Sequence, residues 1–145
     1  MKEFVLDASF TLRWCFEDEA TEATESLLTL LQNQEAMAWV PGIWQHEVLN
    51  GLGKGITRGR VERLKAFLLW QEIRELPLRI EEIPIDLKLL ELALANNLAV
   101  YDASYLSLAM EHHLTIATVD GKLQRAALKP DSTLFHRELA SVSPC

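Results

Sequence analysis

Four acidic side chains lie beside apolar stretches of the sequence, where an isolated carboxylate is costly. They are Asp7, Glu47, Asp102 and Asp120. Three of them follow short apolar runs, which are Phe4–Leu6, Leu98–Tyr101 and Thr115–Val119. Such runs predict strands that end at the acids. Ligands of an open parallel sheet bind in the crevice beyond the carboxyl ends of its strands, so neighbouring strands would bring these carboxylates together.

Carboxylates that meet in this way repel one another unless a cation lies between them. Four carboxylates form an all-oxygen ligand set, which suits Mg²⁺, with Mn²⁺ as a substitute, and does not suit Zn²⁺. The pair His46–Glu47 begins a zinc-protease motif, but that motif needs a second histidine where Asn50 stands. The ligand chemistry therefore predicts a hard divalent ion.

Each acid also has a purely structural explanation. Asp7, Asp102 and Asp120 precede helical patterns, and Asp is a common N-cap because its carboxylate accepts free backbone N–H groups. Asp120 is followed by a glycine, and the two together are also a turn signal. Glu47 lies at or beside the apolar stripe of a helical pattern, where pairing with Arg13 or another cation would explain its charge. Both interpretations remain open, since one Asp can serve as cap and ligand at once.

The bulk composition limits the classes of protein to consider. The chain has 145 residues, 49% of them hydrophobic, which is typical of one globular domain. A net charge of −7 argues against attraction of nucleic acid by the charge of the protein as a whole. A nucleic-acid substrate would therefore need a local basic patch or bound cations. Cys15 and Cys145 lack metal-ligand spacing. No run approaches the roughly 18 apolar residues of a membrane span, so we expect a soluble, cytoplasmic protein with no membrane partner.

Strand-like and helix-like segments alternate along the chain. The expected strands are 4–6, 36–40, 78–83 and 115–119, with an edge strand at 133–135. The expected helices are 8–16, 21–34, one opened by Pro41 and ending near a turn at 57–59, 61–75, one from Asp86 to about 95, one from Asp102, and 122–128. This alternation predicts an α/β fold with a parallel sheet covered on both faces.

Four segments, in this order, resemble the motifs of the PIN-domain family, and in particular the VapC-type toxins of bacterial and archaeal toxin–antitoxin pairs. They are Val5–Ser9, Pro41 with Glu47–Asn50, Val100–Leu106 and Thr118–Asp120. The resemblance covers nearly the whole chain, and the sequence Val-Tyr-Asp-Ala at 100–103 is a fairly specific part of it.

The resemblance implies that residues 1–145 form a single PIN-like domain, a three-layer α/β/α sandwich around a parallel sheet of about five short strands. It implies an Mg²⁺-dependent endoribonuclease that hydrolyses phosphodiester bonds of RNA, with tRNA or rRNA as candidate substrates. It gives catalytic and metal-binding roles to Asp7, Glu47, Asp102 and Asp120, and a supporting hydroxyl to Thr118. It also implies a homodimer, and a cognate antitoxin whose C-terminal segment occupies the groove.

Two surfaces suggest binding partners. One segment concentrates positive charge, and its cations are Lys54, Arg58, Arg60, Arg63 and Lys65. We predict that this basic segment follows the phosphates of RNA, the alternative being a solvated helix face. Trp39, Trp44 and Trp70 offer apolar surface for a dimer or antitoxin interface.

Other functions are compatible with the same fold. A related nuclease could act on DNA, and a catalytically inactive domain could keep the fold to bind a partner. A non-catalytic regulatory domain could use Asp7 and Asp102 as a receiver-like acidic pocket. Such a receiver needs a Lys at the end of its last strand, whereas the expected strand at 133–135 ends at His136.

Overall fold

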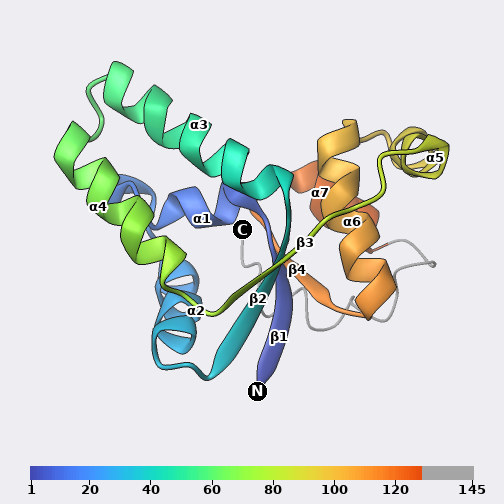
Figure 1. Ribbon diagram of the computed structural model, residues 1–145, viewed down its shortest axis with the longest axis horizontal. Coiled ribbons are helices and arrows are strands. Elements are labelled where there is room, and N and C mark those ends of the chain that lie inside the picture. Colours follow the sequence, from blue (N-terminus) through green and yellow to red (C-terminus); the bar gives the residue numbers. More distant parts are fainter. Residues whose placement is uncertain (129–145) are drawn as a thin grey trace.

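The computed structural model describes residues 1–128, in which helices surround a central sheet (Figure 1). The strands are β1 (Lys2–Leu6), β2 (Ala36–Pro41), β3 (Leu78–Glu81) and β4 (Thr115–Ala117). The helices are α1 (Ala8–Arg13), the 3-10 helix η1 (Glu17–Glu19), α2 (Glu22–Gln32), α3 (Ile43–Thr57), α4 (Arg63–Arg74), α5 (Leu87–Ala95), α6 (Val100–His112) and α7 (Gly121–Ala127).

The four strands pair in the order β3-β2-β1-β4, and every pair is parallel. Val5 of the inner strand β1 lies opposite Trp39 of β2 on one side and Ile116 of β4 on the other. Because all strands run the same way, they end at one edge of the sheet. Asp7 follows β1 directly at this edge, and Asp120 lies three residues beyond β4.

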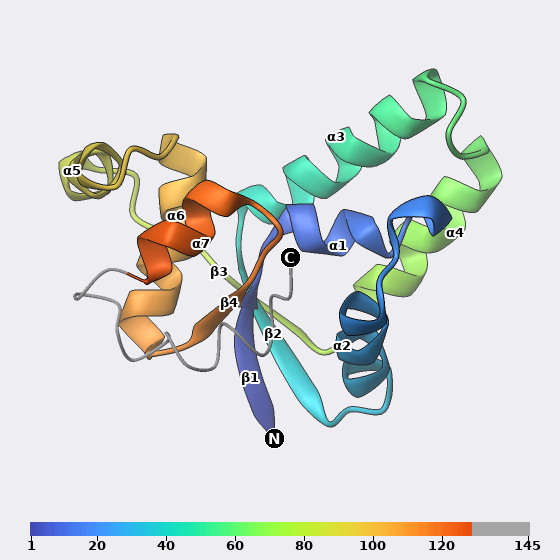
Figure 2. The same ribbon diagram turned by 180° about the vertical axis from the view of Figure 1, so that it is seen from behind.

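The helices form a layer on each face of the sheet. Helices α1 to α4 lie on one side and α5 to α7 on the other, as both views show (Figures 1 and 2). Helix α2 contacts β2, and α6 contacts both β1 and β2. Val5 and Leu6, whose side chains point to opposite faces, are both fully buried. The prediction of an α/β fold with a covered parallel sheet is confirmed.

Local sequence signals explain where several helices begin. Thr21 and Thr24 form a capping box at the start of α2. Asp86 caps α5 by accepting hydrogen bonds from the backbone N–H groups of Lys88 and Leu89. The turn expected at 57–59 is also present, because α3 ends at Thr57 and Gly59 has a φ of 72°, a conformation that favours glycine.

Three expectations about elements differ from the structure. The run Leu98–Tyr101 is no strand, because α6 begins at Val100 and Asp102 lies in its first turn. Pro41 does not open a helix, because it ends β2 opposite Glu81 of β3. Residues 1–128 contain four strands where about five were expected for the whole chain, and the strand expected at 133–135 lies outside the described residues.

Within residues 1–128, no helix combines the length and the hydropathy that crossing a lipid bilayer requires.

Candidate metal centre

Asp7 is the most buried of the four acids, with 4% of its surface exposed. It occupies the N-cap position of α1, but its side chain makes no capping hydrogen bond. Its Oδ2 instead accepts hydrogen bonds from the hydroxyl of Ser9 at 2.5 Å and from the hydroxyl of Thr118 at 2.6 Å. Burial raises the pKa of Asp7, these two hydrogen bonds lower it, and the nearby charge of Asp120 raises it again. The capping explanation therefore does not account for the Asp7 carboxylate.

Thr118 and Ser9 connect the ends of β1 and β4. The Thr118 hydroxyl oxygen accepts a hydrogen bond from the backbone N–H of Asp120 at 3.0 Å while its hydrogen points to Asp7. Ser9 accepts a hydrogen bond from the backbone N–H of Val119 at 3.3 Å. This network fixes Asp7 relative to the turn that carries Asp120.

Glu47 lies on α3 and is half-buried. Its Oε1 accepts a hydrogen bond of 2.6 Å from the hydroxyl of Tyr105 on α6. Burial raises the pKa of Glu47, the Tyr105 hydrogen bond lowers it, and the charges of Asp7 and Asp102 raise it further. Among the ion pairs of residues 1–128, none involves Glu47, so the alternative of a pairing with Arg13 or another cation is wrong.

Asp102 is half-buried in the first turn of α6. Burial, followed by the charges of Asp7 and Asp120, raises its pKa from 3.8 to about 6, while Lys122 acts in the opposite direction. The helix N-terminus near Asp102 is capped by no side chain. Asp102 is therefore an acid held among other acids, and not an N-cap.

Asp120 does act as an N-cap. Its Oδ1 accepts hydrogen bonds from the backbone N–H groups of Lys122 at 2.8 Å and Leu123 at 3.2 Å, at the start of α7. The structural explanation is confirmed for this residue. Both bonds end on Oδ1, so the cap does not use Oδ2.

The structure thus brings the four predicted acids into one electrostatic group. Asp7 perturbs the pKa values of Glu47 and Asp102, and Asp120 perturbs those of Asp7 and Asp102. The pKa values that shift all rise, which means that the fold disfavours the ionised carboxylates. A hard divalent cation relieves this repulsion, and the all-oxygen donor set fits such an ion. Four acids whose charges act on one another are therefore present at this edge of the sheet.

A second group of possible metal ligands in the described chain is more closely spaced than these four acids. Glu81, Glu111 and His112 place one ligand atom each within 4.8 Å of one another. That group includes the C-terminal end of α6, whereas Asp102 lies at its N-terminal end. The Nε2 of His112 already contacts Glu81 Oε2 at 2.8 Å, and its ring stacks on Trp39, with centroids 4.2 Å apart. A hydrogen bond and a ring contact thus already engage Glu81 and His112 of this second group.

Two side chains of the site received no role from the sequence. Ser9 and Tyr105 both lie inside the motifs, but a serine and a tyrosine there carry no signal of their own. The spacing offers one clue, because Ser9 follows Asp7 by two residues and Tyr105 follows Asp102 by three, which is one helical turn. The partner of Tyr105, Glu47, is 58 positions away in the sequence, and only the fold reveals it.

A groove begins beside the acids and runs along the basic segment. Its volume is about 290 Å³, and Ser9 and Val119 of the acidic site contribute to its lining. Four cations also line it, and these are Arg13, Lys54, Arg58 and Arg60. The groove therefore extends from Ser9, a hydrogen-bond partner of Asp7, to a concentration of positive charge. None of the four acids lines it, and the acid that does is Glu19.

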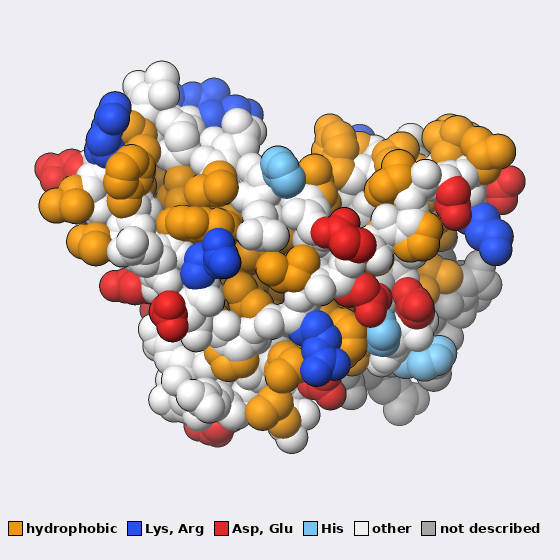
Figure 3. All heavy atoms as spheres, viewed as in Figure 1, with side chains coloured by type: hydrophobic (Ala, Val, Ile, Leu, Met, Phe, Trp, Pro, Cys, Tyr) orange, Lys and Arg blue, Asp and Glu red, His pale blue; other side chains and the backbone are white. Residues whose placement is uncertain are grey.

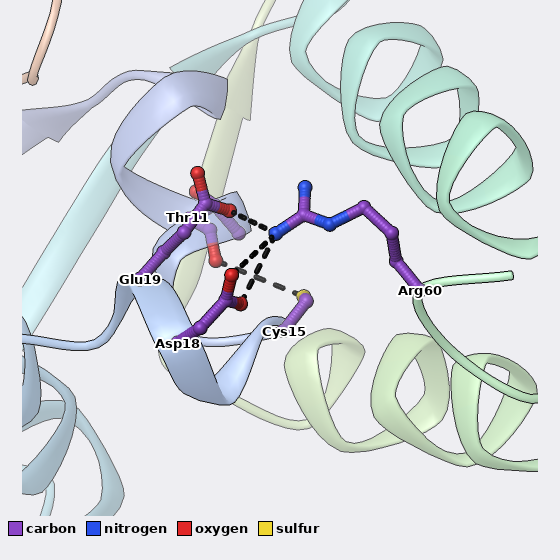
Figure 4. Close-up of polar contacts among 5 residues, drawn as sticks. All are labelled: Thr11, Cys15, Asp18, Glu19 and Arg60. Atoms are coloured by element: carbon purple, nitrogen blue, oxygen red, sulfur yellow. Dashed lines mark hydrogen bonds and ion pairs between the residues drawn. The ribbon is translucent and has the colours of Figure 1, made fainter. Parts of the chain in front are cut away.

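Part of the basic segment is already paired with acids of η1. Arg60 contacts Asp18 at 3.1 Å and Glu19 at 3.3 Å, and Lys65 contacts Glu17 at 3.0 Å (Figure 4 for Arg60). The guanidinium of Arg60 also lies 4.3 Å from the centroid of the Phe16 ring. Arg13, Lys54 and Arg58 make no ion pair among the residues that the structure describes. These three are the cations of the groove that remain available to an anionic ligand.

The expected apolar interface residues are mostly interior. Trp44 is fully buried and Trp39 is 9% exposed, so neither offers the surface that we expected. Trp70 instead lines an apolar groove of about 350 Å³ between α3 and α4. Figure 3 shows hydrophobic side chains gathered over these two helices, and the exposed ones are Leu49, Leu64, Phe67 and Leu68.

Comparison with known proteins agrees with this arrangement. The crystal structure of PAE2754 from Pyrobaculum aerophilum superposes with a TM-score of 0.69 at 19% sequence identity, and the match covers 97% of this chain and 96% of that one. At this identity the likeness is one of fold. A search of curated proteins found no significant match. The family model described as "PIN domain" matches residues 4–129, a span that begins in β1, runs through α7 and includes all four acids. The chain therefore belongs to the PIN-domain family.

Proposed function

We propose that this protein is an Mg²⁺-dependent endoribonuclease and the toxin of a VapBC-type toxin–antitoxin pair. PIN domains are generally nucleases that bind divalent metals, and this chain carries such a domain. The observation that supports the proposal most is the groove, since Arg13, Lys54 and Arg58 line it together with Ser9. The hydroxyl of Ser9 donates a hydrogen bond to Asp7, so the groove reaches a neighbour of the acidic site. A polyanion lying in that groove would meet the cations along its backbone and the acidic site at one end.

Each of the four acids has its own role in this proposal. Asp7 and Asp102 hold the principal divalent ion, Glu47 orients the attacking water or completes the set of ligands, and Asp120 assists. A bound Mg²⁺ supplies charge stabilisation at the attacked phosphate and activates a water. Ser9 and Thr118 keep Asp7 in place through their hydrogen bonds to Oδ2, so that carboxylate loses little freedom when it becomes a ligand.

Cleavage of RNA by the purified protein tests this proposal. We expect cleavage that requires Mg²⁺ or Mn²⁺, stops on chelation and is lost in Asp7→Asn. A single-stranded DNA of the same sequence is the comparison, because a DNA-directed nuclease would cut it equally well. Undiminished cleavage by Asp7→Asn protein would show that the acids do not carry the activity. Absence of cleavage together with absence of metal binding would favour an inactive, partner-binding domain.

The proposed partners are an antitoxin and a second copy of the chain. The apolar groove between α3 and α4 supports the proposal, because exposed Leu49 and Phe67 line it together with Trp70. The mass of the purified protein, from size-exclusion chromatography with light scattering, tests the homodimer. A monomer at micromolar concentration would contradict it.

A further inference from the structure

Tyr105 is fully buried, and its hydroxyl lies in the acidic site. A buried hydroxyl needs a hydrogen-bond partner, and the backbone or a neutral side chain usually provides one. Trp44, which is also fully buried, donates to the neutral hydroxyl of Thr11 at 3.0 Å. Trp39, which is 9% exposed, donates to the carboxylate of Glu3 at 2.9 Å, at the opposite end of β1 from the acids. Tyr105 also donates to a carboxylate, that of Glu47, at 2.6 Å.

This hydrogen bond connects the two helical layers above the edge of the sheet. Tyr105 lies on α6, one turn after Asp102, and Glu47 lies on α3 in the opposite layer (Figures 1 and 2). The packing of helix α6 thus positions both the Asp102 carboxylate and the Tyr105 hydroxyl at the site. The bond ends on Oε1 of Glu47, so the second oxygen, Oε2, is not used by Tyr105.

The geometry of the hydrogen bond restricts the Glu47 carboxylate. The Tyr105 hydroxyl donates to one carboxylate oxygen only, at 2.6 Å, and the ring that carries this hydroxyl is fully buried and therefore fixed by packing. A carboxylate held by one oxygen loses its freedom to rotate, which leaves the other oxygen in a defined position.

We propose that Tyr105 is a positioning residue, which holds Oε1 of Glu47 and so directs Oε2 toward the divalent ion. This inference rests on the proposed function, since it concerns the same acidic site. Partners that orient a metal ligand from behind typically change metal affinity by about 10- to 100-fold when they are removed. Tyr105→Phe removes only the hydroxyl oxygen and leaves the packed ring in place.

Calorimetric titration of the metal-free protein with Mn²⁺ tests this inference without any measurement of cleavage. We expect Tyr105→Phe to bind Mn²⁺ about 10- to 100-fold more weakly than the wild type. The matched control is Tyr101→Phe, the chain's other tyrosine, which lies on the same helix and is 55% exposed. We expect its affinity for Mn²⁺ to be unchanged. In a Glu47→Ala background, Tyr105→Phe should cause no further loss, because its effect passes through Glu47.

Each result has a distinct meaning. Equal Mn²⁺ affinity of the wild type and Tyr105→Phe overturns the inference and leaves the proposed function standing. A loss that persists in the Glu47→Ala background also overturns it, because Tyr105 would then act by another route. No Mn²⁺ binding by the wild type overturns the proposed function together with this inference. If Tyr105→Phe does not fold, a crystal of the wild type with Mn²⁺ decides, and Glu47 rotated away from Tyr105 would overturn the inference.

Discussion

The Thr118 hydroxyl donates a 2.6 Å hydrogen bond to Oδ2 of Asp7, although the two residues are 111 positions apart in the sequence. The bond joins the end of β4 to the end of β1, and Ser9 adds a second donor to the same oxygen. Two hydroxyl donors lower the pKa of Asp7, but burial raises it by more. The ionised carboxylate is therefore tolerated at a cost to the fold, which a bound cation would offset.

We expect Asp7→Asn to make the metal-free protein more stable. The substitution keeps the size and an oxygen acceptor while removing the buried charge, so the gain should be on the order of 1 kcal/mol, or about 3 °C in Tm. Thermal unfolding at pH 8 in a chelator measures it. Added Mg²⁺ should raise the Tm of the wild type and not that of the variant. A lower Tm for metal-free Asp7→Asn would mean that the Asp7 carboxylate serves stability and not metal binding.

The raised pKa of Asp102 predicts how stability depends on pH. A carboxyl whose pKa rises from 3.8 to about 6 on folding contributes stability that is complete below pH 4 and is lost as the pH rises to 6. The metal-free wild type should therefore lose stability across this window relative to Asp102→Asn. Melting curves of both proteins at half-unit intervals of pH, with the difference in Tm plotted against pH, give the test. A flat difference between pH 4 and pH 7 would contradict the raised pKa.

The same shift predicts the pH dependence of metal binding. A metal ligand must be deprotonated, and the pKa values of Asp7, Glu47 and Asp102 are all raised. We therefore expect Mn²⁺ affinity to increase steeply between pH 5 and pH 7. Calorimetry in two buffers of different ionisation enthalpy would measure the protons released. Affinity that does not change over this range would mean that carboxyls with raised pKa values do not hold the metal.

Arg58 and Arg60 should differ in their contributions to RNA binding. Arg58 lines the groove without an ion pair among the described residues, whereas Arg60 is held by Asp18 and Glu19. Arg58→Ala should therefore lower the slope of log affinity against log salt by about 1, the loss expected for one phosphate contact. Arg60→Ala should leave that slope near the wild-type value. Filter binding or fluorescence anisotropy in an Asp7→Asn background, which prevents cleavage, measures both. Identical slopes for the two variants would contradict the role of η1.

Two glycines of α3 provide a stability test with an internal control. A Cβ on Gly55 would lie 2.7 Å from Cε1 of the buried Phe16 ring and 3.2 Å from Cγ1 of Val61. Gly55→Ala should therefore destabilise the protein by about 1–3 kcal/mol. A Cβ on Gly53 meets nothing within 4 Å, so Gly53→Ala should stabilise the helix by about 0.5–1 kcal/mol. Urea unfolding of the two variants measures the difference, and equal midpoints would refute the close approach at Gly55.

The parts of the fold that follow from buried apolar runs could be predicted from the sequence. The run before Asp7 belongs to β1, and the run before Asp120 begins with β4. The apolar side chains of both strands are buried on the two faces of the sheet. The run before Asp102 looked the same but is not a strand. Val100 is 39% exposed and Tyr101 55% exposed, so these apolar residues do not belong to the core. Ala99 at the N-cap gives no polar signal for the start of α6, and the helix was therefore predicted two residues late.

The electrostatic grouping of the four acids could be predicted, but the hydrogen bonds around them could not. Acids beside apolar residues indicated Asp7, Glu47, Asp102 and Asp120, and the structure makes all four part of one electrostatic group. The hydroxyls of Ser9 and Tyr105 were missed because their partners depend on how β1 meets β4 and how α3 meets α6. The pairing of Arg60 with η1 was missed for the same reason, since Asp18 lies 42 positions away.

Asp7 and Asp102 are held by different kinds of secondary structure. Asp102 lies on a helix, which could shift while the sheet stays intact. Asp7 is continuous with β1, whose ladder hydrogen bonds fix its position, whereas Asp102 lies on α6, which rests on β1 and β2 and packs against α5. A small rigid-body slide or rotation of α6 would change the separation of the two carboxylates without breaking a single strand pairing. We therefore expect substitutions between α5 and α6 to change the distance between the Asp7 and Asp102 carboxylates without altering either residue.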